Sequence, residues 1–474
     1  MFHRKILSKL QSWKDRNHCC LILKGQRQIG KTTVVEEFGR IAYDNFVLLD
    51  LFKEPMARRI MEENDTVDEL VDAISLYKGV DIHPKTSLII LDEIQESTKA
   101  RSKLRLFSED GRYDVIATGS MLGVSDARLG IYKKNVNPDL LPVGTEEHLM
   151  MYPMDFEEFL LAVGMKQKDI DKVRDKIRKR IELTSTELEV FSKRFSIYEV
   201  VGGMPAAVSA FVEGGINAAM HVLDGIRATC VNDINRYNAG VDAIKTQECF
   251  EAIPRQLSDT NKRYMYSRID NGGSRSSGEK YRENLLWIKY AGYGIFSYAL
   301  TGIRRPPERF TQNDVFKVYL SDTGLLMSMM GPDSQTAILA GDTDHDFGAV
   351  TENAVMSCLH RAGYMISYYR RTSKTDKMEI DGIIDCKGLI CIEVKTGSER
   401  SYPSLSKTIG DVNVSRRVIF EKGNVVMTPD GIEHYPLFAA AFVFPENERE
   451  LDESLTEGCI GDPFGSENHS ILPN

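Results

Sequence analysis

The feature that most constrains this chain is the octapeptide Gly25–Thr32, GQRQIGKT, which matches Gly-x-x-x-x-Gly-Lys-[Ser/Thr] at every fixed position. It follows an apolar run, His18 to Leu23, and precedes a helical pattern. This order predicts a buried strand, a glycine-rich turn whose backbone N–H groups converge on phosphate oxygens, and a helix that begins near Gly30. Lys31 would reach the β- and γ-phosphates, and Thr32 would bind magnesium. The alternative, a glycine turn that binds nothing, is disfavoured by the flanking strand and helix.

Two later apolar runs end in polar residues that suit nucleotide chemistry. Ser87 to Glu93 ends in Asp92 and Glu93. An aspartate at the C-terminal edge of a strand can hold the water shell of magnesium, and a neighbouring glutamate can polarise the attacking water. Alone, such a run is commonly a strand leaving the core. The phosphate loop upstream favours the functional interpretation.

A further strand, Asp114 to Ser120, ends in small polar residues. If this strand lies beside the first, Ser120 could contact the γ-phosphate. We favour it over Thr118 because it is nearer the strand end, and a turn-forming role is an equal alternative. Arg128 is a candidate arginine finger, although an exposed loop arginine is more often a solvated charge. The predicted nucleotide-binding set is Gly25, Gln28, Gly30, Lys31, Thr32, Thr33, Asp92 and Ser120, with ATP and Mg²⁺ as ligands and Lys31 and Glu93 as catalytic residues.

The alternation of strands and helices predicts an α/β fold with the parallel sheet of a P-loop NTPase over residues 1–160. After its last strand comes Pro153-x-x-Phe-x-Glu-Phe159, a segment that turns into a helix capped by Asp155. With these motifs the sequence resembles a prokaryotic family of AAA-type ATPases that carry a C-terminal domain of unknown function. The resemblance extends through the turns at 202–205 and 321–326 to about residue 440.

The middle of the chain is predicted to be helical. Residues 161–240 form a lid or spacer, with a charged, solvated stretch from Lys166 to Arg194 and a structural corner at Gly202–Pro205. Residues 241–335 give helix, helix, then an aromatic hairpin, which suggests a winged helix, as the family resemblance also implies. Winged helices also serve as protein-interaction modules, so DNA contact is one of two interpretations. Six bases could neutralise duplex phosphates: Arg275, Lys280, Arg282, Arg304, Arg305 and Arg309.

The segment 336–444 carries a second acidic set. A predicted helix, 348–362, bears Glu352, and two strands joined by a short turn carry Asp381, Glu393 and Lys395 near one end. The set resembles the Asp…Glu-x-Lys nucleases of the restriction-endonuclease-like fold. That resemblance implies Mg²⁺ held by Asp381, Glu393 and Glu352, with Lys395 orienting the nucleophile. A cross-strand ion pair is the simpler alternative, and a fold can outlive its chemistry.

Composition limits the remaining possibilities. The chain has 474 residues and a formal net charge of −9. The segment 445–474 is a predicted disordered tail with eight acidic residues and one basic residue. The rest of the chain is therefore nearly neutral, and its net charge does not by itself indicate nucleic-acid binding. Eight scattered cysteines without metal spacing, and no apolar run near 18 residues, indicate a cytoplasmic protein with no membrane partner.

Together these features predict a Mg²⁺-dependent ATPase that drives a DNA-associated activity, with metal-dependent cleavage as a candidate. The alternative is a nucleotide-switched protein-interaction module with an inactive nuclease-like domain. A homo-oligomer or a protein partner is compatible with either.

Overall fold

The computed structural model describes residues 1–16, 20–120, 146–238, 240–259, 262–269, 278–340, 348–372, 377–397 and 402–446. Its first sheet is parallel throughout, as predicted, with the strand order β2-β3-β4-β1-β5. Strand β4 therefore lies between the phosphate-loop strand β1 and the strand β3 that ends in Asp92. The strands are β1 (Cys20–Gly25), β2 (Asn45–Asp50), β3 (Ser87–Asp92), β4 (Asp114–Ser120) and β5 (Glu146–Met150).

Helices cover both faces of this sheet. One face packs against α1 (Ile6–Arg16) and α2 (Lys31–Ala42), and the other against α3 (Pro55–Glu63), α4 (Val67–Lys78) and α5 (Thr98–Asp110). Successive residues of β3 alternate between the two cores, which explains why its sequence is apolar without interruption.

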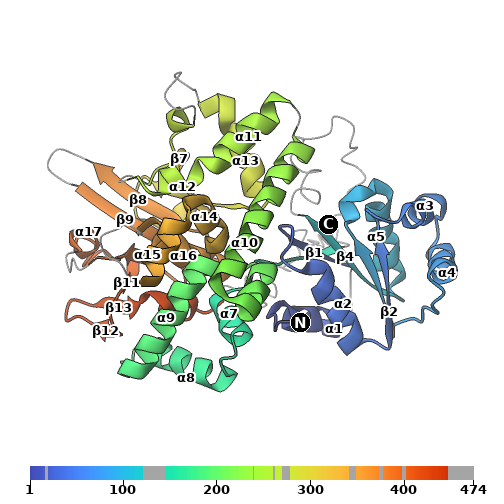
Figure 1. The fold of residues 1–474 in the computed structure, drawn as a ribbon, viewed down its shortest axis with the longest axis horizontal. Coiled ribbons are helices and arrows are strands. Elements are labelled where there is room, and N and C mark those ends of the chain that lie inside the picture. Colours follow the sequence, from blue (N-terminus) through green and yellow to red (C-terminus); the bar gives the residue numbers. More distant parts are fainter. Residues whose placement is uncertain are drawn as a thin grey trace, which may run out of the picture.

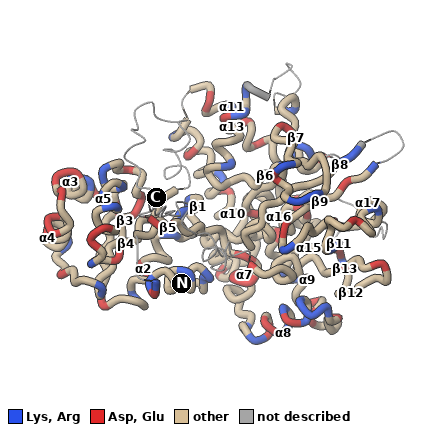
Figure 2. The backbone as a smooth tube through the Cα atoms, turned by 180° about the vertical axis from the view of Figure 1, so that it is seen from behind, with Lys and Arg blue, Asp and Glu red and all other residues tan. Residues whose placement is uncertain are grey.

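Helices fill the middle of the molecule, between the two sheets (Figure 1). Asp155 caps α7, as predicted, in a reciprocal arrangement with Glu158. The charged stretch forms two helices instead of one, and α9 buries Phe191, Phe195 and Tyr198. Basic and acidic residues alternate along α8 (Figure 2), while its Ile170, Val173 and Ile177 lie in the core. The helices are α7 (Phe156–Ala162), α8 (Gln167–Arg178), α9 (Ser185–Val201), α10 (Pro205–Tyr237), α11 (Val241–Glu251), α12 (Ile253–Leu257), α13 (Gly278–Tyr290), α14 (Thr323–Met330) and α15 (Pro332–Ala340).

Helix α10 is an exception to the expectation that no segment is long and apolar enough to cross a membrane. Within the described part of the chain it is the one helix that meets this criterion by length and composition. Its helical conformation is interrupted at Gly215, and its Leu223 and Ile226 pack in the main core. Near its end Asp233 pairs with Arg27 of the phosphate loop. The C-terminal part of α10 therefore packs against the rest of the protein.

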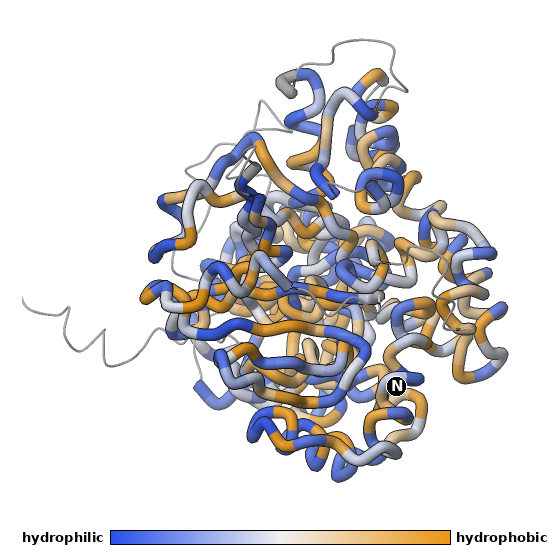
Figure 3. Tube along the Cα trace, turned by 90° about the vertical axis from the view of Figure 1, so that its left-hand side faces the viewer, coloured by the Kyte–Doolittle hydropathy of each residue, from blue (hydrophilic) through white to orange (hydrophobic). Residues whose placement is uncertain are grey.

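The second sheet has eight strands in the order β12-β13-β11-β10-β9-β8-β6-β7. Its inner face packs on α16 (Gly348–Arg361), and its outer face carries a smaller core with α17 (Pro403–Ser406). Hydrophobic stretches of its strands alternate with hydrophilic segments in Figure 3. The strands are β6 (Gly294–Leu300), β7 (Thr311–Leu320), β8 (Ser367–Thr372), β9 (Lys377–Asp385), β10 (Leu389–Val394), β11 (Val414–Glu421), β12 (Val426–Met427) and β13 (Ile432–Pro436).

The predicted hairpin and the predicted C-terminal domain share this one sheet. Strand β6 pairs in parallel with β8, so the hairpin β6–β7 extends the sheet at its edge. The expected boundary between residues 335 and 336 lies in α15, and strands from both sides of it belong to one sheet. The first domain is followed by a helical region and a further sheet, as the sequence predicted in outline.

Candidate functional site

The phosphate loop connects β1 to α2 at the C-terminal edge of the first sheet. A Cβ atom on Gly25 would lie 2.5 Å from both Ile29 Cδ1 and the Met151 carbonyl oxygen, so glycine is required there. Gly30 has a φ of 87°, in the left-handed region that favours glycine. Helix α2 begins at the next residue, and its first N–H groups are therefore available to an anion in the loop.

The side chain of Lys31 is buried and folds back over this loop. Its Nζ donates to the carbonyl oxygens of Gly25 at 3.0 Å and Gln26 at 2.9 Å. Burial lowers the pKa of Lys31 to about 8, although Glu93 and Asp92 oppose the shift. Phosphate oxygens would offer this ammonium stronger acceptors than two neutral carbonyls.

Asp92 meets two hydroxyl groups at the end of β3. Thr32 Oγ1 lies 3.0 Å from each carboxylate oxygen, and Thr118 Oγ1 also donates to Asp92. Burial raises the pKa of Asp92, and the two hydroxyl hydrogen bonds oppose that shift. A threonine hydroxyl and a carboxylate are oxygen ligands of the kind that Mg²⁺ prefers, so this pair fits the ion chemically.

The other predicted nucleotide-binding residues lie on the phosphate loop, on α2 and at the ends of β3 and β4. Ser120 is buried and lies opposite Gly25 in the register of β4 and β1, while Glu93 directly follows Asp92 and accepts a hydrogen bond from Gln95. Thr33 is exposed on the first turn of α2, and exposed Gln28 donates to Thr229 of α10 at 3.4 Å. Arg128, the candidate finger, lies outside the described residues.

Two further loop residues connect the nucleotide site to the second half of the protein. Arg27 donates to Asp233 Oδ1 at 2.7 Å and to the Tyr237 hydroxyl at 2.8 Å, both on α10. Asp233 in turn accepts from the hydroxyl of Tyr293, which precedes β6, at 3.0 Å. The loop therefore contacts α10 directly and the second sheet through one more hydrogen bond.

Gln26 makes a second connection. Its buried Oε1 accepts from the hydroxyl of Ser321, which follows β7, at 2.9 Å, and the Ser321 N–H donates to the Tyr293 carbonyl at 2.9 Å. The Gly202–Pro205 corner lies close by, because the Gln26 amide nitrogen is 3.3 Å from the Met204 sulfur. A Cβ on Gly203 would lie 1.9 Å from the Met154 carbonyl oxygen, which supports the expected structural corner.

The C-terminal acidic residues have different partners. Glu352 of α16 accepts from Lys262 at 2.6 Å, from Lys317 at 3.1 Å and from the Tyr319 hydroxyl at 2.5 Å. Lys317, on β7, has a fully buried side chain whose Nζ is also 3.7 Å from Asp381. The ammonium of Lys317 thus lies between two of the carboxylates that were expected to hold magnesium.

The charges of this cluster compensate one another. Burial disfavours the charged form of Lys317, but Glu352, Asp381 and Glu379 outweigh it and raise the pKa of the lysine. Burial likewise opposes ionisation of Glu352, yet Lys317 and Lys262 lower its pKa. The pKa of Asp381 is raised by burial and by Glu352. The lysines therefore supply the positive charge that buried carboxylates require.

Glu393 and Lys395 form a pair at the end of β10. Lys395 Nζ lies 3.5 Å from Glu393 Oε2, and burial raises the pKa of Glu393 to about 7. Within the described ranges, no three Asp, Glu, His or Cys side chains are close enough together to hold a metal ion. Glu352, Asp381 and Glu393 are therefore not brought together as a three-ligand set, and the cluster does not fit a divalent cation as it stands.

Comparison with protein families agrees with the geometry of the first site. An AAA domain model matches residues 17–160, and a domain of unknown function (DUF8612) matches residues 192–336. The chain therefore contains an AAA domain, followed by a domain of unknown function. No curated protein sequence matches it.

Several solved structures match this chain at low sequence identity. A Walker-type ATPase of Pyrococcus abyssi is 13% identical, with 70% of this chain and 96% of that chain covered and a TM-score of 0.43. A signal-transduction ATPase with a tetratricopeptide repeat sensor from Pyrococcus horikoshii is 11% identical, with 76% and 45% covered and a TM-score of 0.26. Pif1 helicases on forked double-stranded DNA are 14% identical, with 41% and 52% covered and a TM-score of 0.21.

The sequence motifs did not reveal several residues that contact the two candidate sites. Lys317 and Tyr319 occupy alternate positions of a strand whose neighbours Phe316, Val318 and Leu320 are apolar. A lysine inside such a run signals a buried charge that needs carboxylate partners. Arg27 and Gln26 carry no comparable signal, because the variable positions of a phosphate loop do not reveal what they contact.

Proposed function

We propose that this protein binds and hydrolyses ATP with Mg²⁺ and uses the cycle to drive an activity on DNA that does not include cleavage. The observation that carries the ATPase part is the contact of the Thr32 hydroxyl with the Asp92 carboxylate at 3.0 Å. It joins the phosphate loop to the acidic strand end, which is what magnesium-dependent nucleotide chemistry needs.

Each residue of the site has a separate task in this proposal. Lys31 exchanges its two carbonyl partners for phosphate oxygens and orients them. Glu93 orients the attacking water and accepts its proton, and Ser120 hydrogen-bonds the terminal phosphate. When bound, Mg²⁺ would neutralise charge on the phosphates, held by Thr32 and, through its water shell, by Asp92.

The contacts of Arg27 and Gln26 support the coupling of hydrolysis to the second half. A nucleotide that displaces the Lys31 ammonium from the loop carbonyls alters the backbone that positions these two side chains. Their partners lie on α10 and at the open end of the hairpin β6–β7, next to the start of β6 and the end of β7. Loop movement would therefore be transmitted to the second sheet through a short chain of buried or half-buried hydrogen bonds.

The test of the ATPase part is ATP turnover by the full chain. We expect Lys31→Ala to abolish turnover, while the exposed-residue variant Lys99→Ala keeps it. Equal rates for Lys31→Ala and the wild type would refute the proposal.

The buried positive charge of Lys317 argues against DNA cleavage by the second sheet. Cleavage of the nuclease kind requires a divalent ion at the carboxylates, and a fully buried ammonium already balances Glu352 and Asp381. We expect no cleavage of duplex or single-stranded DNA with Mg²⁺ or Mn²⁺. Cleavage that is lost in Asp381→Ala would restore the nuclease hypothesis.

The alternative is a nucleotide-switched module that binds a protein partner. The salt dependence of binding affinity distinguishes it from a DNA-binding protein. Contacts to several phosphates must weaken steeply with rising salt, whereas a protein partner need not show this dependence. For both versions we propose a cytoplasmic location and allow a homo-oligomer.

A further inference from the structure

A pocket of about 660 Å³ lies on the outer face of the second sheet, away from the acidic cluster. Its walls come from the segment after β6, from β8 and β9, and from the segment after α17. Ile303 and Met378 are buried in its floor and belong to the core that includes α17, whereas Glu352 lies on the opposite face. The volume is in the usual range for a small ligand or one unit of a larger one.

Three cations reach this pocket from three different segments. They are Arg304, Arg371 and Lys407, and the pocket contains one carboxylate, Asp411. Asp411 Oδ1 accepts hydrogen bonds from the backbone and side-chain nitrogens of Asn413, each at 2.9 Å. Within the described part of the chain, Arg304 makes no hydrogen bond or ion pair. The pocket is therefore positively charged and offers at least one arginine to an anion.

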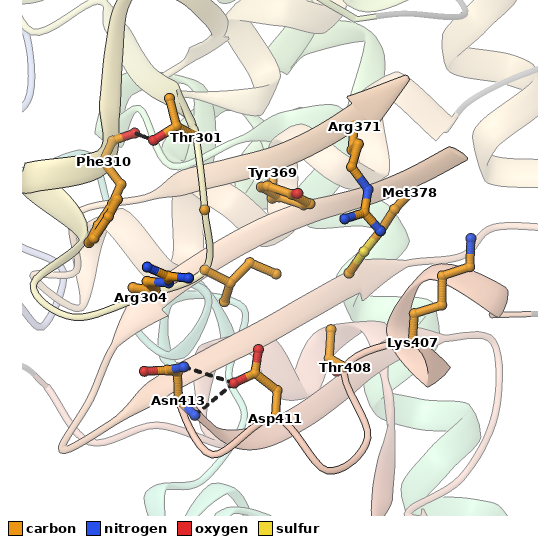
Figure 4. Close-up of a pocket in the computed structure, with 12 residues that line it drawn as sticks. Thr301, Arg304, Phe310, Tyr369, Arg371, Met378, Lys407, Thr408, Asp411 and Asn413 are labelled. Atoms are coloured by element: carbon orange, nitrogen blue, oxygen red, sulfur yellow. Dashed lines mark hydrogen bonds between the residues drawn. The ribbon is translucent and has the colours of Figure 1, made fainter. Parts of the chain in front are cut away.

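The cations lie on opposite sides of an aromatic ring. Figure 4 shows Arg304 on one side of the pocket and Arg371 and Lys407 on the other, with the ring of Tyr369 between them. Phe310 adds a second aromatic side chain beside Arg304. Basic positions also occur along the neighbouring strands β8 and β9 in Figure 2.

We propose that this pocket binds single-stranded nucleic acid, with one base against Tyr369 and the two flanking phosphates at Arg304 and at Arg371 with Lys407. A sequence-tolerant strand site combines an aromatic platform with cations along the backbone, which is the combination found here. A free mononucleotide carries phosphate on one side only, so cations on both sides of the ring favour a continuous strand. The inference rests on the proposed DNA association and specifies the form of the nucleic acid and its contacts.

Arg305 provides a matched control for Arg304. The two arginines are adjacent in one loop and exposed, but Arg305 pairs with Asp385 at 2.7 Å and does not line the pocket. Loss of either side chain removes the same charge from the same loop. Only the loss of Arg304 removes a cation from the pocket.

The experiment measures binding of a fluorescein-labelled oligothymidylate of about ten nucleotides to the full chain by anisotropy, over a range of salt concentrations. We expect Arg304→Ala to weaken binding about tenfold and to reduce the slope of log affinity against log salt by about 0.7, since one phosphate contact is lost. Arg305→Ala should stay within about twofold of the wild type. Tyr369→Leu should weaken binding about tenfold, while Tyr369→Phe keeps it, because stacking needs only the ring.

Three outcomes would overturn the inference. Equal effects of Arg304→Ala and Arg305→Ala would remove the pocket from the binding site and leave the proposed DNA association intact. Displacement of the oligonucleotide by thymidine monophosphate at equal nucleotide concentration would make the pocket a mononucleotide site. No binding of the oligonucleotide or of duplex DNA would refute both the pocket and the DNA part of the proposed function, whereas ATP turnover would still report on the ATPase part.

Discussion

Two groups of buried carboxylates in this protein were expected to hold magnesium, and they differ in what faces them. Asp92 receives hydrogen bonds from the neutral hydroxyls of Thr32 and Thr118. Glu352 and Asp381 face the ammonium of Lys317 instead. Neutral hydroxyls leave the negative charge of a carboxylate available to a metal cation, whereas a buried lysine neutralises that charge. The partners of a carboxylate therefore decide its metal chemistry as much as its position in the fold does.

The largest expected effect comes from a change at the nucleotide site, next to Asp92. Glu93→Gln keeps the shape of the site but removes the group that accepts the proton of the attacking water. We expect ATP turnover to fall by about 10²–10⁴-fold while ATP binding is retained. The exposed-residue variant Glu62→Gln should leave turnover unchanged, and unaltered turnover in Glu93→Gln would remove Glu93 from the mechanism.

The second prediction concerns a change in the C-terminal acidic cluster. Lys317→Met removes the buried ammonium and leaves Glu352 and Asp381 short of positive charge. The free energy of unfolding should fall by about 3–5 kcal/mol, as for other buried charges that lose their partner. Mn²⁺ should restore part of that loss, because the variant has carboxylate charge to offer a cation.

Lys395→Met is the control for this change, since Lys395 is partly exposed and 3.5 Å from its carboxylate. Thermal unfolding with and without Mn²⁺ measures both effects. If Mn²⁺ stabilises wild type and Lys317→Met equally in the absence of nucleotide, Lys317 does not take the place of a metal ion.

A third buried carboxylate, Glu199, extends the comparison to a group whose pKa is raised mainly by burial. Burial raises the pKa of Glu199 to about 7, and Thr351 and Lys422 oppose this shift. Because the folded-state pKa lies above the unfolded value, the stability associated with protonated Glu199 is present below about pH 4.5 and is lost as the pH rises through 7. Glu199→Gln should thus be stabilised over the wild type by on the order of 2–3 kcal/mol at pH 8 and hardly at all at pH 5.

Chemical denaturation at the two pH values measures this difference. Glu189, exposed on the same helix α9, gives the matched variant Glu189→Gln, which should show no pH-dependent difference. A constant offset between Glu199→Gln and the wild type at both pH values would contradict the assigned cause.

The smallest expected effect concerns the connection between the two halves. A double-mutant cycle with Arg27→Ala and Asp233→Ala should give a coupling of about 1 kcal/mol in the free energy of unfolding, since the pair is partly exposed. A non-hydrolysable ATP analogue should change this coupling if the loop moves on binding. A coupling that nucleotide leaves unchanged would argue against transmission through Arg27.

Sequence patterns predicted the first sheet almost strand by strand, because its strands are buried on both faces and end in residues with a recognisable task. They also predicted the two C-terminal strands that carry Asp381 and Glu393, β9 and β10, but not β11, β12 or β13. They did not reveal that β6 and β8 pair, because strand pairing across about 70 residues leaves no local pattern. The place of Lys317 followed from that pairing and was missed with it.

The most direct test of the central contrast counts metal ions. Mn²⁺ binding to the full chain is titrated in the presence of a non-hydrolysable ATP analogue, for the wild type, Asp92→Asn and Asp381→Asn. We predict one tightly bound ion per chain, lost or strongly weakened in Asp92→Asn and unchanged in Asp381→Asn. Two tightly bound ions in the wild type, or loss of an ion in Asp381→Asn, would contradict the account.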